Sequence, residues 1–221
     1  MKSRQPEPAP YHHGDLRRAL IAAALAMVTE EQDWTFSLRE VARRAGVSPS
    51  APYNHFADKR DLLAEVAVSG FQRLHDGLAA AVADLRSPPD ALIVCLGTYV
   101  RLGRENPALY RLMFGPELTT FKEAERPPRM VTAGTEAKAV LLQIISDGTR
   151  SGDFALPTEK EEPVALATFV AWSAVHGLTM LIIDNLTGEH VHAEAAIEKA
   201  IQTQLGGLMH GMPRTPVKPE K

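Results

Sequence analysis

The segment from Ser37 to Lys59 constrains the fold of this chain more than any other part of its sequence. Its first half carries apolar residues at helical spacing, which predicts a helix with one buried face: Leu38, Val41, Ala42 and Ala45. Ser37 and Glu40 have the spacing of a capping box, in which each side chain bonds the other residue's backbone N–H. Gly46 follows where a left-handed residue ends a helix. The sequence therefore predicts a short helix with a defined beginning and end.

The second half of the segment predicts another short helix, and Pro52 limits where it can begin. If Ser48 caps this helix, Pro52 is its fourth residue and removes the first intrahelical hydrogen bond. If Ser50 is the cap, Pro52 falls in the first turn, whose N–H groups have no intrahelical partner. We expect a distorted or late-starting helix, followed by a longer helix that Asp58 caps.

Two short helices joined by a glycine-containing turn form a helix-turn-helix, whose second helix enters the major groove of DNA. The local charge agrees, since residues 37–60 hold five basic and two acidic side chains in a chain of net charge −3. These are Arg39, Arg43, Arg44, Lys59 and Arg60 against Glu40 and Asp58. The alternative is an ordinary helical hairpin with a solvated basic face.

Residues 46–63 resemble the DNA-binding domain of the TetR/AcrR family of bacterial repressors. The family's G-V-S, aromatic-x-H-F, lysine and leucine-pair pattern is present as Gly46, Val47, Ser48, Tyr53, His55, Phe56, Lys59, Leu62 and Leu63. The upstream stretch YHHGDLRRALIAAAL is similar to the first helix of this family, so the likeness covers about residues 11–70. Pro52 departs from the pattern, because the family usually has a bulky aliphatic residue there.

The rest of the chain also predicts helices, so we expect an all-α fold. Apolar periodicity and proline or glycine breaks place them at about 15–29, 58–85, 91–104, 107–114, 129–151, 163–186 and 193–209, with a helical turn in the loop 115–128. We expect a disordered arm at 1–10, a three-helix DNA-binding domain at 11–60, a helical regulatory and dimerisation domain at 61–211, and a disordered tail at 212–221. Cys95 is the only cysteine, which fits a reducing cytoplasm.

Residues 163–186 form an apolar stretch long enough to cross a membrane. It lacks a basic flank, since EKEE precedes it and Asp184 and Asn185 follow. Small residues within it favour close helix packing, so we interpret it as a helix buried in protein and expect no membrane partner. Its AWSAVHGL segment resembles the Trp-His-Gly motif of a C-terminal domain in one TetR branch.

The resemblance implies a dimer that represses transcription at a near-palindromic operator and is released by a small hydrophobic effector. It implies phosphate contacts from Tyr53, His55 and Lys59, while Ser37 offers a phosphate contact from its cap and Arg39 a contact to a guanine edge. Ser48, Pro49, Ser50, Ala51 and Asn54 are expected on or near the groove-facing surface. Candidate pocket residues are Leu92, Cys95, Leu96, Tyr99, Tyr110, Met113, Phe114, Trp172, His176 and Met180.

Two other functions remain open from the sequence. One is a DNA-binding regulator that a partner protein controls, and the other is an enzyme with an incidental helix-turn-helix. No nucleophile elbow, HExxH pair or Cys/His cluster is present in the sequence, so we expect neither a catalytic site, nor a metal site, nor a cofactor.

Overall fold

The structure, a computed structural model, describes residues 13–119, 127–158 and 161–211. Every regular element in these ranges is helical. In chain order they are α1 (His13–Glu31), α2 (Leu38–Arg44), the 3-10 turn η1 (Ala51–Asn54), α3 (Lys59–Val82), α4 (Pro88–Glu105), α5 (Pro107–Phe114), α6 (Pro116–Thr119), α7 (Pro128–Ser151), α8 (Glu162–Ile183) and α9 (Ala193–His210). The predicted all-α fold is confirmed, whereas the expected arm and tail lie outside the described residues.

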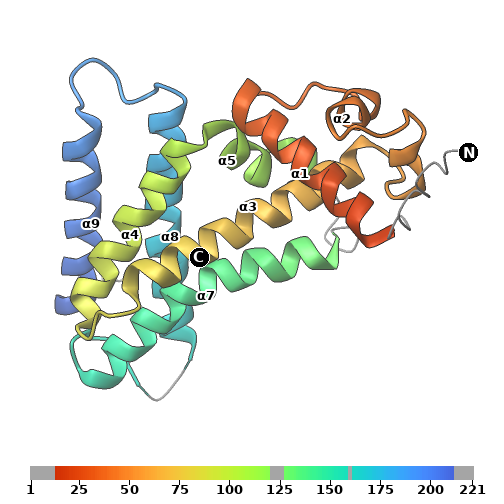
Figure 1. Ribbon diagram of the computed structural model, residues 1–221. Coiled ribbons are helices and arrows are strands. Elements are labelled where there is room, and N and C mark those ends of the chain that lie inside the picture. Colours follow the sequence, from red (N-terminus) through yellow and green to blue (C-terminus); the bar gives the residue numbers. More distant parts are fainter. Residues whose placement is uncertain (1–12, 120–126, 159–160, 212–221) are drawn as a thin grey trace, which may run out of the picture.

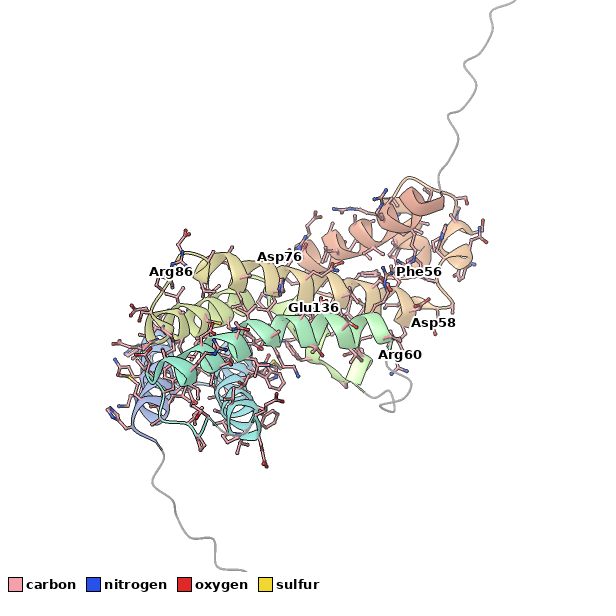
Figure 2. All side chains as sticks on the ribbon, turned by 90° about the horizontal axis from the view of Figure 1, so that it is seen from below. Phe56, Asp58, Arg60, Asp76, Arg86 and Glu136 are labelled. Atoms are coloured by element: carbon pink, nitrogen blue, oxygen red, sulfur yellow. The ribbon has the colours of Figure 1, made fainter. Side chains whose placement is uncertain are left out.

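Helix α3 joins the two ends of the molecule (Figure 1). Asp58 caps it as predicted, its carboxylate accepting a hydrogen bond of 2.8 Å from the Asp61 N–H. From there α3 runs past Asp76, with Glu136 of α7 alongside it (Figure 2). Its first half packs on α1 and its flanks also contact α4, α5 and α7, so a single helix belongs to both halves of the structure.

The N-terminal unit is built around one face of α1. Leu20, Ala24 and Val28 of this helix are completely buried. Val41 of α2 is equally buried and Phe56 is 1% exposed. Their burial holds α1, α2 and the start of α3 together at one end of the molecule (Figure 1).

The C-terminal helices form the other end, where α8 and α9 stand side by side, far from α2 (Figure 1). Ser87 caps helix α4, and Pro88 is its first residue. Proline is favoured there because the N–H that it lacks would have no partner within the helix. Helix α7 ends at Ser151, and its C-cap residue Gly152 has a left-handed φ of 84°. Phe154 then turns back against Gly148 and is 2% exposed, which closes this end of the core.

Helix α8 is only partly buried within its own chain. It packs on α4, α7 and α9, but only 22% of its most apolar 18-residue window is buried. Leu166, Phe169, Val170 and Leu181 are 61%, 59%, 39% and 46% exposed, at helical spacing along one side. Among the described residues, α8 alone is long and apolar enough to cross a membrane, by length and composition. Such an exposed apolar face is typical of an interaction surface.

Candidate nucleic-acid interface and ligand pocket

The start of α2 is fixed by the capping box that the sequence predicts. Ser37 Oγ accepts a hydrogen bond from the Glu40 N–H at 3.3 Å, and Glu40 Oε2 accepts one from the Ser37 N–H at 2.7 Å. The backbone and hydroxyl hydrogen bonds from Ser37 lower the pKa of the Glu40 carboxyl. The Glu40 carboxylate therefore stabilises the start of α2 as part of the capping box.

The turn after α2 is a Schellman motif. The Gly46 N–H donates to the Arg43 carbonyl at 3.2 Å and the Val47 N–H donates to the Ala42 carbonyl at 3.0 Å. Gly46 has a φ of 69°, which a residue with a Cβ adopts only with strain. This turn directs the chain from α2 into the second element of the helix-turn-helix.

That second element is a single 3-10 turn, η1, with Ser50 as its N-cap. Pro52 therefore lies in the first turn, where it removes no intrahelical bond, and the prediction of a distorted, late-starting helix is confirmed. The Pro52 carbonyl accepts hydrogen bonds from the N–H groups of His55 and Phe56, both at 2.9 Å. The candidate recognition element is shorter and more tightly wound than an α-helix.

Most of the predicted DNA-contacting side chains lie on the surface of this unit. Exposed residues are Ser37, Arg39, Ser48, Pro49, Ser50, Asn54 and Tyr53, the last of them 56% exposed. His55 and Lys59 are partly exposed, and the Lys59 ammonium lies 5.4 Å from the centre of the Phe36 ring. Ala51 differs from the expectation, because it is only 8% exposed and its methyl group packs inward. The role of these residues in DNA binding stays a prediction.

A cavity of about 300 Å³ lies in the C-terminal half, between α3, α4, α5, α7 and α8. Its lining is almost wholly apolar and rich in aromatic and methionine side chains. The structure brings six of the ten predicted pocket residues to its wall: Cys95, Leu96, Tyr99, Met113, Phe114 and Trp172. Of the others, Leu92 and Tyr110 are buried, while His176 and Met180 are partly buried.

Sequence reasoning missed the walls that α3 and α7 contribute. These are Phe71, Leu74 and Leu78 from α3, and Met130, Val131, Gly134, Thr135, Ala137, Lys138 and Leu141 from α7, with Val175 from α8. The apolar periodicity of residues 58–85 predicts a helix but does not say which of its residues face a cavity. Gly134 gave a usable signal, since a glycine inside a helix is less stable than an alanine and therefore points to a packing or functional reason.

Tyr99 and Trp172 of the cavity wall form a hydrogen-bonded cluster with two side chains outside the lining, Tyr110 and His176. Tyr99 Oη accepts hydrogen bonds from Tyr110 Oη at 2.9 Å and from Trp172 Nε1 at 3.1 Å, and His176 Nδ1 lies 2.7 Å from Tyr110 Oη. Burial raises the pKa of the Tyr99 hydroxyl to about 12, raises that of Tyr110 and lowers that of His176. These groups are neutral near pH 7, so the cluster places polar atoms, without charge, at the pocket wall.

Comparison with known proteins defines the class to which this arrangement belongs. Residues 20–66 match the family model described as bacterial regulatory proteins, tetR family. Residues 92–204, just over half of the chain, match the model described as tetracyclin repressor-like, C-terminal domain. The two matches cover the helix-turn-helix and the helical domain that holds the cavity. The fold and the site together define a helix-turn-helix transcriptional regulator with a separate C-terminal domain.

Individual relatives agree with this assignment. An uncharacterized HTH-type transcriptional regulator, YobS of Bacillus subtilis, is 25% identical over 89% of this chain and 94% of its own length. A solved structure of a protein with unknown function from Rhodococcus sp. RHA1 is 30% identical, with a TM-score of 0.75 over 92% of this chain and all of the other. A TetR family transcription regulator from Marinobacter aquaeolei VT8, 21% identical over 88% of this chain and 96% of its own, shares the fold with a TM-score of 0.62.

The chain belongs to the tetR family of bacterial transcriptional regulators. Members of this family bind DNA through the helix-turn-helix as dimers, and they are regulators and not enzymes. The third possibility left open by the sequence, an enzyme with an incidental helix-turn-helix, is thereby excluded.

Proposed function

We propose that this regulator is a repressor whose dimer binds a near-palindromic operator and is released by a small hydrophobic effector. The observation that carries the proposal is the apolar cavity, because its wall includes Phe71, Leu74 and Leu78 of α3. The same helix begins at Lys59, beside the candidate recognition turn. One rigid element therefore borders both the effector cavity and the DNA-binding surface.

The DNA-binding surface that we propose consists of Tyr53, His55 and Lys59 on phosphates and Arg39 on a base edge. Its support is the exposure of Tyr53 and Arg39 and the partial exposure of the other two side chains. Residues around Ser48–Ser50 flank this surface. We place the DNA-binding domain at residues 11–60 and the regulatory domain at 61–211, and the protein in the cytoplasm, where bacterial DNA is accessible.

The proposed dimer uses the open face of α8 together with α9. Leu166, Phe169 and Leu181 project from this face, and a Cβ at Gly177 would meet no atom within 4 Å. A second copy related by a two-fold axis covers such a face with the same face of its own. The two recognition turns would then enter successive major grooves, about 34–36 Å apart or somewhat more. The two-fold symmetry is what makes the operator near-palindromic.

Effector action requires a difference in affinity between two conformations. A ligand that binds both states equally shifts nothing, so the effector must prefer the state in which the two recognition turns cannot reach both half-sites. Because the cavity lies against α3, an occupant can favour one tilt of that helix over another.

The test begins with selection of bound fragments from the source genome by the full-length protein. The selected operator is then titrated in an anisotropy assay while hydrophobic small molecules are screened for thermal stabilisation and for operator release. Compounds that do both support the proposal. Compounds that stabilise the protein but never loosen DNA at saturation overturn the effector-release model and favour a co-repressor, or a regulator that a partner protein controls.

A further inference from the structure

Lys138 is the one charged residue among the described side chains that line the cavity. It lies on the exposed side of α7, at the edge of an otherwise apolar and aromatic wall. No aspartate or glutamate is present among the residues of this lining. The cavity therefore offers one positive charge and no negative charge to an occupant.

The sequence around Lys138 provides no acidic neighbour on its helix face. The positions three and four residues away are Gly134, Thr135, Leu141 and Leu142. Those are the positions from which a carboxylate forms an ion pair within a helix. Within the described residues no carboxylate lies within ion-pair distance of Lys138, whereas five arginines of the same domain have one, among them Arg129, which lies 3.5 Å from Glu65. The other four pairs are Arg101–Glu105, Arg104–Glu194, Arg111–Asp184 and Arg150–Asp147.

Trp172 holds the Lys138 ammonium at the cavity. The ammonium lies 5.3 Å from the centre of the indole ring, in cation–π geometry. The indole itself is fixed, because its Nε1–H donates a hydrogen bond of 3.1 Å to Tyr99 Oη. The hydroxyl of Thr135 donates to the Val131 carbonyl at 2.9 Å, so its proton is already used. Lys138 is thus the strongest hydrogen-bond donor at this end of the cavity.

We propose that the effector is a small hydrophobic monocarboxylate whose carboxylate pairs with Lys138 and whose apolar body fills the cavity. This inference rests on the proposed effector control and names the chemical class of the effector. A cation would be desolvated here without a counter-charge, and a single ammonium balances a single anionic group. The body lies among Phe71, Phe114 and Leu96, and the volume of about 300 Å³ is at the small end of ligand cavities.

The experiment compares acids with their uncharged amides on the full-length dimer. Octanoate and 3-phenylpropionate are the two probes, because they distinguish a linear aliphatic body from an aromatic one, and octanamide and 3-phenylpropanamide are their controls. Binding is measured by calorimetry on wild type, Lys138→Gln, Lys138→Arg and the control Lys199→Gln. Lys199 is an exposed lysine of α9 and is absent from the cavity lining.

We expect at least one acid to bind wild type about tenfold more tightly than its amide. Lys138→Gln should abolish the preference for the acid and leave the affinity for the amide unchanged. Lys138→Arg should keep most of the preference for the acid, and Lys199→Gln should keep all of it. Equal affinity for acid and amide, an unchanged preference in Lys138→Gln, or no binding of either acid overturns the inference.

Operator release by the same compounds separates this inference from the proposed function. If amides bind and release the operator as well as acids do, effector control stands and the carboxylate assignment falls. If an acid binds through Lys138 and the operator stays bound at saturation, the carboxylate assignment stands and effector release falls.

Discussion

Neutralising Glu65 is expected to weaken the contact between the DNA-binding unit and the regulatory helices. Glu65 lies on α3 and its side chain is 12% exposed. Arg17 of α1 contacts it with both terminal nitrogens: Nη2 is 3.0 Å from Oε1, and Nη1 donates to Oε2 at 3.3 Å. Arg129 of α7 approaches the same carboxylate at 3.5 Å. One carboxylate thus connects three helices.

The magnitude follows from the exposure of each partner. Hydrogen bonds to charged groups contribute about 1.5–3 kcal/mol, but solvent screens Arg17, which is 32% exposed, so we expect Glu65→Gln to cost about 1–2 kcal/mol. Arg129 is 70% exposed, and Arg129→Gln should cost less than about 0.5 kcal/mol. Glutamine is the substitution of choice because it keeps the shape and leaves Arg17 over the Phe56 ring, 5.3 Å from its centre.

Thermal unfolding at fixed protein concentration measures this effect, since a dimer's Tm depends on concentration. A loss of 1–2 kcal/mol corresponds to a Tm lowered by about 2–8 °C for a chain of this size, with Arg129→Gln as the matched control. A Glu65→Gln protein that melts together with wild type, or an Arg129→Gln protein that loses as much, would refute the assignment of Glu65 as the shared partner.

Three further predictions concern DNA, assembly and packing. Lys59→Ala should weaken binding to all DNA sequences and reduce the slope of log affinity against log salt concentration by about one. Arg39→Ala should cost about 1–3 kcal/mol of binding free energy on the selected operator and relax the base preference at one position. A salt titration that shows neither change would mean that the recognition surface is wrongly assigned. Gly177→Leu should leave secondary structure intact but dissociate the dimer in sedimentation at micromolar concentration, because Gly177 has open space within its own chain; an unchanged dimer places the interface elsewhere. Gly103→Ala should instead destabilise the fold by about 1–3 kcal/mol in urea, since its Cβ would overlap Thr179 Cγ2, and wild-type stability of this variant would contradict the close α4–α8 packing.

Local signals allowed the helix ends to be predicted from the sequence. The caps at Ser37 and Asp58 and the glycine stop at Gly46 act within a turn of chain, so residues close in sequence determine them. The start of the second helix was left between Ser48 and Ser50, because either serine can cap a helix and only the cost of Pro52 distinguishes the two starts. In the structure Ser50 is the N-cap, and Ala51 and Pro52 pack inward as buried residues.

The cavity was predicted only in part because its walls meet through tertiary packing. Tyr99, Phe114 and Trp172 were identified as candidates by their side-chain types, and they do line one cavity. Nothing in the periodicity of α3 or α7 states which of their apolar residues face a void and which face each other. The position of Lys138 at the cavity was not predicted, because a single lysine on a helix is usually a solvated surface charge and the sequence does not show its spatial neighbours.

In the proposed mechanism, α3 is the element through which a small change at the cavity would reach DNA. Phe71 lies twelve residues after Lys59 on α3, which is about 18 Å along a straight helix. A tilt of about 5° about the cavity end would displace the Lys59 end by roughly 1.5 Å at that length. Hydrogen bonds to phosphate weaken over less than this distance, and in a two-fold dimer both recognition turns move at once. Under the proposed mechanism an effector would need only to favour a slight tilt of α3, and the ion pairs of Glu65 with Arg17 of α1 and Arg129 of α7 would couple that tilt to the DNA-binding unit.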